Sequence, residues 1–187
     1  MTTAADDARL ITRIASQDEA ALRLLLARHQ AGLFRFAQRL LRNEAMAEEV
    51  TNEVFLEVWR NARKYEGRAS VATWLFSIAH HRAVSVLRKR GEETWNADEA
   101  ERLEDGSDTP EVATQKSDEA DMLKRCIGEL SAEHREIIDL VYYHEMSIAE
   151  AADVLAIPEN TVKTRMFYAR KRLSELLRAR NVDRGWP

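Results

Sequence analysis

Residues 147–177 read SIAEAADVLAIPENTVKTRMFYARKRLSELL. Ser147 and Glu150 have the spacing of a capping box, which predicts the start of a short helix. A tight turn around Ala156 follows, and Pro158 fits the first turn of a longer helix, where its missing N–H group costs nothing. Two helices joined in this way predict a helix-turn-helix, whose second helix can enter the major groove of DNA.

The predicted second helix has two chemically different faces. Its apolar face comprises Val162, Met166, Ala169, Leu173, Leu176 and Leu177. The opposite face carries no acid and comprises Thr161, Thr164, Tyr168, Lys171 and Arg172, with Arg165 at its edge. Hydroxyl groups and cations of this kind reach DNA phosphates, and Thr161 and Arg165 lie where a recognition helix contacts base edges. An ordinary amphipathic surface helix is the alternative.

The composition of the chain indicates a helical protein. Of its 187 residues 45% are hydrophobic, which is enough to form a core, but six glycines and three prolines are few for the turns of an all-β fold. A single cysteine, Cys126, excludes an internal disulfide and a multi-cysteine metal site. The sequence shows neither a basic-then-apolar leader nor an apolar run of roughly 20 residues. We therefore expect a cytoplasmic protein without membrane insertion.

Charge is distributed unevenly along the chain. The net charge of −4 combines +5 over residues 1–91, −10 over residues 92–121 and +1 over residues 122–187. The middle segment has almost no apolar periodicity and gathers turn-forming residues between Gly106 and Pro110. We expect an all-α protein with two small helical domains, one on each side of a flexible acidic linker. The acidic residues of this linker either keep it solvated or compete with nucleic acid for the basic faces of the two domains that the linker joins.

Caps and periodicity divide the first predicted domain into helices. Ser16 opens a candidate capping box, and the leucines behind it form an inward stripe with Gly32 as the candidate break. A third helix is expected over residues 44–64. Ser70 is expected to cap a fourth helix, which runs through Arg90.

The predicted third helix has an unusual outer face. Opposite its valines it presents Glu48, Glu49, Asn52, Leu56 and Trp59. Exposed apolar bulk beside carboxylates is more typical of a protein-binding patch than of a solvated face. A protein partner is therefore expected for this helix.

The loop and helix between Tyr65 and Arg90 interleave aromatic and basic residues. One stripe of the helix carries Trp74, Ser77, His81, Ser85 and Arg88. Aromatic rings stack on bases and cations follow the backbone, so this pattern suits single-stranded DNA. A buried Trp74 is the alternative. His80 and His81 point in different directions, and we interpret them as structural or polar residues rather than as a metal pair.

Three motifs occur in order across both predicted domains. They read AEEVTNEVFLEVW at 47–59, SVATWLFSIA at 70–79 and ENTVKTRMFYAR at 159–170. Together they resemble the extracytoplasmic-function sigma factors, a group of small bacterial sigma factors. The resemblance implies a region 2 domain, residues 1–91, that binds the clamp coiled coil of RNA polymerase and opens the minus-ten element. It also implies a region 4 domain, residues 122–187, that binds the polymerase flap and reads the minus-thirty-five element.

The resemblance implies roles for individual residues as well. Contacts to the polymerase clamp are expected from Glu48, Glu49, Asn52, Glu53, Leu56 and Trp59. Contacts to the minus-ten element are expected from Tyr65, Arg68, Ser70, Trp74, His81, Arg82 and Arg88. Contacts to the minus-thirty-five element are expected from Thr161, Thr164, Arg165, Tyr168, Lys171 and Arg172. His81 and Ser85 stand where the family often has asparagine and aspartate, which bears on minus-ten preference.

The implied partners are core RNA polymerase, promoter DNA and an anti-sigma factor that clamps the two domains, in a stress response. No cofactor, metal ion or catalytic residue is expected, because the sequence shows no nucleophile–base grouping, metal-ligand spacing or glycine-rich phosphate loop. One alternative is a helical metal-dependent hydrolase that uses His29, His80, His134 or His144. Others are a helix-turn-helix regulator or sigma mimic that does not act through core polymerase, and an interaction module whose basic faces are solvated.

Overall fold

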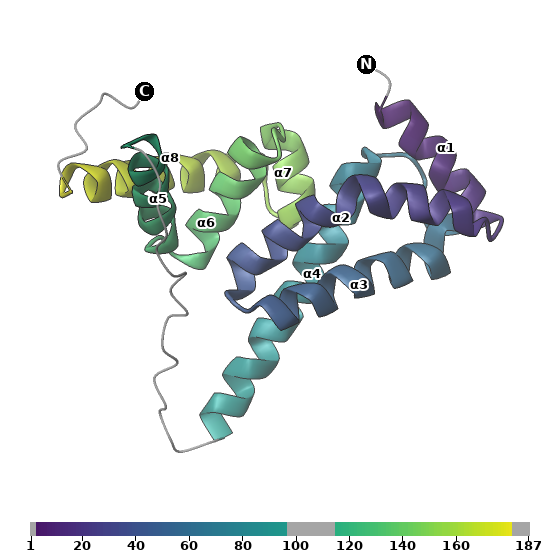
Figure 1. The fold of residues 1–187 in the computed structure, drawn as a ribbon, viewed down its shortest axis with the longest axis horizontal. Helices are drawn as coiled ribbons and strands as arrows, with labels where there is room; N and C mark the ends of the chain where they lie inside the picture. Colours follow the sequence, from purple (N-terminus) through teal and green to yellow (C-terminus); the bar gives the residue numbers. More distant parts are fainter. Residues whose placement is uncertain (1–2, 97–114, 181–187) are drawn as a thin grey trace.

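The computed structural model describes residues 3–96 and 115–180, and these residues form helices and the loops between them. The N-terminal domain comprises α1 (Thr3–Ala15), α2 (Glu19–Leu41), α3 (Glu44–Asn61), the 3₁₀ helix η1 (Ala62–Lys64) and α4 (Val71–Asn96). The C-terminal domain comprises α5 (Gln115–Gly128), α6 (Ala132–Ile138), the π-helical turn η2 (Asp139–Tyr143), α7 (Ile148–Leu155) and α8 (Glu159–Arg178) (Figure 1). The all-α prediction is confirmed for the described residues.

The predicted linker falls mainly on residues 97–114, which lie outside the described residues. On its N-terminal side, α4 continues to Asn96, and on its C-terminal side α5 begins at Gln115. Within the described part of the chain, no helix combines the length and the apolar character that crossing a membrane requires.

Two predictions about α2 are wrong. The capping box at Ser16 does not form, because Asp18 caps α2 instead, and its side chain accepts a hydrogen bond from the backbone N–H of Ala21 at 3.1 Å. The break at Gly32 does not occur either, since α2 runs through this residue. Gly32 instead lies close to the C-terminal domain, where an added Cβ atom would be 3.6 Å from Cε1 of His144.

The N-terminal domain is built around α2, α3 and α4, which pack against one another. Its most deeply buried side chains include Leu25, Leu33, Phe36, Val54 and Leu75. Helix α1 is joined to α2 by the buried Asp7, whose carboxylate lies 2.7 Å from both Arg28 Nη1 and His29 Nε2. A buried carboxylate needs such partners, because leaving it unpaired costs free energy.

The C-terminal domain contains the predicted helix-turn-helix. Ser147 and Glu150 form the capping box of α7 in full, with both reciprocal hydrogen bonds present. Helix α7 ends at Leu155 and is capped by Ala156, which has a φ of 52°, and α8 begins just after Pro158. The apolar face predicted for α8 is buried throughout, at Val162, Met166, Ala169, Leu173, Leu176 and Leu177. The fold of this half therefore follows the periodicity of the sequence.

The two domains pack directly against each other. Helix α7 contacts α4, and α6 contacts α2 (Figure 1). Buried residues of both domains, among them Phe36 and Phe76 on one side and Ile137 and Leu140 on the other, belong to a single hydrophobic cluster. This docking of the domains was not predicted from the sequence.

Candidate nucleic-acid and protein interfaces

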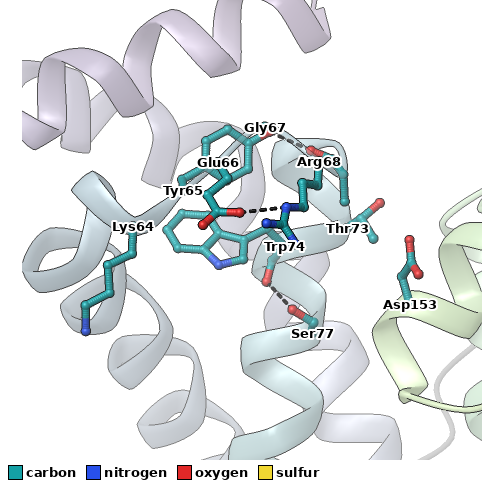
Figure 2. A pocket seen from close by; sticks show the side chains of 10 residues that line it. Lys64, Tyr65, Glu66, Gly67, Arg68, Thr73, Trp74, Ser77 and Asp153 are labelled. Atoms are coloured by element: carbon teal, nitrogen blue, oxygen red, sulfur yellow. Dashed lines mark hydrogen bonds and ion pairs between the residues drawn. The ribbon is translucent and has the colours of Figure 1, made fainter.

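A cavity of about 220 Å³ lies beside the loop between η1 and α4. Figure 2 shows its walls, which are formed by Lys64, Tyr65, Glu66, Gly67, Arg68, Ala69, Thr73, Trp74, Ser77 and Asp153. Gly67 adopts a φ of 71°, a conformation that glycine takes without strain. The Tyr65 hydroxyl donates a hydrogen bond to the carbonyl oxygen of Ala69 at 2.6 Å and so holds the loop closed on itself.

Two aromatic rings form the apolar wall of this cavity. The ring centroids of Tyr65 and Trp74 are 5.1 Å apart and the planes are tilted by 39°. Both side chains are only partly buried and pack against the hydrophobic core, so Trp74 is neither a core residue nor free in solvent. Burial, with a smaller contribution from Asp7, raises the pKa of Tyr65, which keeps its hydroxyl a neutral donor. Rings held in this way present a surface for a stacked base.

The cationic side of the cavity is formed by the exposed side chains of Lys64 and Arg68. The Arg68 side chain is 86% exposed, and its Nε atom lies 2.6 Å from Oε2 of Glu66. An ion pair in solvent contributes little stability, so exchanging Glu66 for a DNA phosphate costs little. Ser77 lay on the stripe that the sequence analysis assigned to single-stranded DNA, whereas Lys64, Thr73 and Asp153 were not predicted as site residues. Thr73 was detectable from its i, i+4 spacing to Ser77, beside Trp74 on α4.

Four of the residues predicted for the minus-ten element do not line the cavity. Ser70 is the cap of α4, because its Oγ accepts a hydrogen bond from the Thr73 N–H at 3.1 Å. His81, Arg82 and Arg88 lie further along α4. The structure therefore brings together only part of the predicted set.

Arg82 connects the predicted DNA-binding helix to the predicted polymerase-binding helix. Its Nη2 atom lies 3.0 Å from Oε2 of Glu57, and its Nη1 atom lies 3.6 Å from Oε2 of Glu53. Glu53 was predicted to contact polymerase and Arg82 to contact DNA. In this structure Arg82 forms a contact between α4 and α3.

The outer face of α3 is exposed, as expected for a binding surface. Glu48, Glu49 and Asn52 are exposed, and Leu56 leaves 51% of its surface in solvent. Trp59 differs from this group, because it is partly buried and packs against the core. An exposed leucine beside three polar residues is the kind of surface that a protein partner covers.

A groove beside this face was not predicted. Its volume is about 620 Å³, and it is lined by Ala27, Gln30, Ala31, Phe34, Glu44, Glu48, Thr51 and Asn52. Half of these residues belong to α2, which the sequence alone did not place beside the polar face of α3. We define the clamp face as the exposed outer residues of α3 together with this groove.

The polar face of α8 is presented to solvent. Thr164, Lys171 and Arg172 are exposed, Tyr168 is 53% exposed and Thr161 is partly buried. Arg165 is more enclosed, with 25% of its side chain exposed, and its Nη2 atom lies 3.3 Å from Oε1 of Glu133. Phe167 is 64% exposed beside Tyr168, with its ring at 5.4 Å, and was not predicted as a site residue. The face remains largely free of acidic residues. Glu175, which pairs with Arg172, lies near the C-terminal end of α8.

The histidines considered for a metal site lie in separate environments. His29 contacts Asp7, and His80 contacts Glu136 at 2.5 Å. His134 lies at the start of α6, where its backbone N–H donates to Ser131. In the part of the chain that the structure describes, no three histidine, cysteine or acidic residues are grouped as metal ligands.

Comparisons with known proteins agree with both halves of the fold. Residues 25–93 match the family Sigma-70 region 2, and residues 120–173 match the family Sigma-70, region 4. The ECF RNA polymerase sigma factor SigK of Mycobacterium tuberculosis (strain ATCC 25618 / H37Rv) is 32% identical over 173 residues, which cover 90% of this chain and 91% of that protein.

Two solved structures resemble the fold over both domains. The sigma factor RpoE from Bartonella quintana, in complex with the anti-sigma factor NepR, matches with a TM-score of 0.72 at 29% identity and covers 87% of this chain and 98% of that one. CnrH, in complex with the cytosolic domain of CnrY, matches with a TM-score of 0.68 at 25% identity and covers 93% and 98%.

A helical region 2 domain followed by a region 4 helix-turn-helix defines a two-domain sigma factor. The chain belongs to the ECF RNA polymerase sigma factors, the alternative sigma factors that direct core RNA polymerase to promoters. The alternatives of a helix-turn-helix regulator, a hydrolase and a solvated interaction module are therefore set aside.

Proposed function

We propose that the N-terminal domain, residues 1–91, opens the minus-ten element, and that the cavity beside the η1–α4 loop holds an extruded base. The observation that carries this proposal is the combination of two adjacent aromatic rings, an exposed cation and a glycine turn in one cavity. A helix in a groove can read a duplex, but an extruded nucleotide needs a pocket.

The energetics of base extrusion agree with this assignment. Extruding a base costs a few kcal/mol of stacking and pairing, and stacking on an aromatic side chain returns about 1–3 kcal/mol per base. Tyr65 and Trp74 therefore offset most of the cost of one base, while Arg68 is placed to bind the adjacent phosphate. The remaining cost falls on the binding free energy of the polymerase, so the protein alone should bind promoter DNA weakly.

We propose that the clamp face binds core polymerase. Its exposed carboxylates attract a basic partner surface, and Leu56 together with the adjoining groove accepts apolar side chains. Interfaces of this composition gain most of their affinity from a few apolar anchors and gain specificity from charge.

We propose that the C-terminal domain reads the minus-thirty-five element through α8 and binds the polymerase flap. Arg165 is the candidate for reading a base edge, once its pair with Glu133 is released. Lys171 and Arg172 are exposed further along α8 and suit phosphate contacts. In this proposal Arg165 reads a base, and Lys171 and Arg172 bind phosphates further along α8.

An anti-sigma factor is the proposed regulator. Of the similar structures, RpoE was solved in complex with the anti-sigma factor NepR, and CnrH in complex with the cytosolic domain of CnrY. We propose the same kind of control for this chain, in the cytoplasm where core polymerase works. The chain itself acts as a specificity subunit, without catalysis or a cofactor of its own.

Transcription from a random promoter library tests the proposed function. Core RNA polymerase with this protein should enrich templates that share two short conserved blocks at a fixed spacing, relative to core polymerase alone. Sequencing the transcribed templates identifies both blocks. Enrichment of no shared sequence would contradict promoter recognition, and enrichment of the upstream block alone would contradict the role given to the N-terminal domain.

A further inference from the structure

Helix α1 lies outside the residues that match the family Sigma-70 region 2, since that match begins at residue 25. The helix nevertheless packs directly against η1 and α4, the two elements that the loop of the cavity joins. Its inner face is buried at Leu10 and Ile14. Both residues belong to the hydrophobic cluster against which Tyr65 and Trp74 pack. The match to the family therefore does not account for this helix, although it lies directly behind the aromatic wall of the cavity.

A hydrogen bond joins η1 to the end of α1. Nε of Arg63 donates to the carbonyl oxygen of Ala15 at 3.0 Å, across 48 positions of the chain. Ala15 is the last residue of α1, and the last carbonyl groups of a helix have no N–H partner within it, so a guanidinium is a favourable donor there. Tyr65 follows Arg63 by two residues, and its backbone N–H donates to the carbonyl oxygen of Ala62 at 3.2 Å. The contact with α1 therefore fixes the 3₁₀ turn that leads into the cavity loop.

Polar contacts tie both ends of α1 to α2. Arg13 lies 2.8 Å from Asp18, whose side chain also caps α2. Near the start of α1, the buried carboxylate of Asp7 lies 2.7 Å from Nε2 of His29 on α2. Burial, and to a smaller extent the charge of Asp7, raises the pKa of Tyr65, so this carboxylate acts on the ring that forms the cavity wall. Helix α1 is thus a fixed support behind η1.

The loop of the cavity depends on anchors at its two ends. Glu66, Gly67 and Arg68, in the middle of the loop, are exposed. At the C-terminal end of the loop, Ser70 caps α4. At the N-terminal end, the anchor is the contact of Arg63 with α1. A loop that is held at both ends loses less conformational entropy on binding than a loop that is ordered only by its ligand.

We propose that α1 positions the minus-ten cavity, and that Arg63 is the positioning residue that holds Tyr65 in place before DNA arrives. This proposal rests on the function proposed above for the cavity. It adds that promoter melting depends on the first helix of the chain, and on an arginine that binds this helix rather than DNA.

Arg63→Ala is compared with Arg60→Ala, which removes the same charge one turn earlier. Both arginines are exposed, so both variants should stay folded, which thermal unfolding of the full chain checks. Both should bind core polymerase with the affinity of the native chain. On a duplex promoter selected from the random library, Arg63→Ala should give about threefold to tenfold less permanganate-reactive open complex than Arg60→Ala, the range expected for one hydrogen bond. Equal amounts of open complex in the two variants overturn the proposal.

Salt dependence distinguishes positioning from a direct contact between Arg63 and a DNA phosphate. The affinity of the holoenzyme for a template already mismatched across the minus-ten element is measured at several salt concentrations. Arg63→Ala should leave the salt slope unchanged, because no cation is lost from the DNA interface. A slope reduced by about one would make Arg63 a phosphate contact and would overturn the proposal.

A double-variant cycle tests whether Arg63 acts through the ring of Tyr65. The effects of residues that act through one shared contact do not add. The double variant Tyr65→Ala, Arg63→Ala should therefore melt the duplex promoter no less well than Tyr65→Ala alone. Additive losses would show that Arg63 acts elsewhere, and they overturn the proposal. Native melting by Tyr65→Ala alone instead contradicts the function assigned to the cavity.

Discussion

Nδ1 of His80 on α4 lies 2.5 Å from Oε1 of Glu136 on α6, and the Glu136 side chain is only 6% exposed. The two residues are 56 positions apart, in different domains. A carboxylate buried in this way is stable only while its partner is present. The pair is therefore one polar contact across the domain boundary whose contribution to the stability of the docked arrangement can be tested by mutation.

Replacing His80 with leucine should reduce the free energy of unfolding by about 1.5–3 kcal/mol, because Glu136 is left buried without its hydrogen bond. The double variant His80→Leu, Glu136→Leu should recover most of this loss, since neither polar group remains. Urea denaturation of the full chain measures both. His81→Leu, at the exposed neighbouring position, is the control and should change stability by less than about 0.5 kcal/mol. A double variant no more stable than His80→Leu would contradict the pairing.

Docking should weaken at mildly acidic pH. Burial, together with smaller contributions from the nearby charges of Arg39 and Arg35, lowers the pKa of His144 to about 4. Since this pKa lies below the ordinary value of 6.5, separated or unfolded chains bind the proton more tightly. The stability of docking is therefore complete above pH 6.5 and falls as the pH decreases from 6.5 towards 4, by up to about 3 kcal/mol at 1.36 kcal/mol per pKa unit.

Scattering curves of the native chain and of His144→Gln between pH 7.5 and 5 test this prediction. The native chain should expand more than the variant as the pH falls. Asp139, whose Oδ2 atom lies 3.2 Å from Nε2 of His144, and both arginines are retained in the variant, so their own titration cancels in the comparison. The same expansion in both proteins would show that other groups control the response.

The η1–α4 loop should be required for melting rather than for assembly. A Tyr65→Ala, Arg68→Ala variant should still form holoenzyme, because both side chains lie outside the clamp face. On duplex promoters it should give little permanganate-reactive open complex. On a template already mismatched across the minus-ten element it should recover substantially, since the cost of unpairing is removed. Equal defects on both templates would move the melting role elsewhere.

Charge reversal on the clamp face should weaken polymerase binding. Glu49→Lys should reduce the affinity for core polymerase about tenfold, which corresponds to about 1.4 kcal/mol. Its affinity for duplex DNA through α8 should not fall. Trp59→Ala is a less suitable variant, because Trp59 packs against the core and its removal also affects folding. Glu145→Lys, in the other domain, is the control, and an equal loss in both would indicate a general charge effect.

Residues of α8 should separate into base and phosphate contacts. Arg165→Ala should cost about 1–3 kcal/mol at one minus-thirty-five position and relax the preference there. Lys171→Ala should weaken binding to all sequences and reduce the salt slope by about one. Glu133→Ala should raise affinity slightly, because Arg165 no longer has to leave its 3.3 Å contact. Binding titrations at several salt concentrations distinguish these outcomes, and uniform loss in both substitutions on α8 would make Arg165 a phosphate contact.

Local signals predicted the elements that carry their own caps and periodicity. The capping box at Ser147 and the cap at Ser70 form as expected, because a side-chain oxygen three residues from the first free N–H groups satisfies them whatever surrounds it. The same pattern failed at Ser16, where the nearby Asp18 provides the cap instead. When two possible capping residues lie a few positions apart, the backbone conformation between the helices decides which one caps. The sequence pattern does not specify that conformation.

Burial was predictable for α8 and less so for single aromatic residues. Six apolar positions of α8 lie on one stripe, and a stripe of that width has to be buried. Trp74 and Trp59 each lie between a polar and an apolar neighbourhood, and both are partly buried in the structure. Whether such a ring faces the core or a ligand depends on how closely the neighbouring helix approaches.

By itself the sequence determined the helical fold class, the helix-turn-helix, the two-part organisation and the family, because these depend on periodicity, caps and motifs within short stretches. Only the tertiary structure decided what lies across the domain boundary. Asp153 is 79 positions from Trp74 yet lines the same cavity, and Gly32 is shown to be a point of close approach rather than a break. Contacts of this kind depend on which surfaces of the two domains pack against each other, and a local sequence pattern does not predict those surfaces.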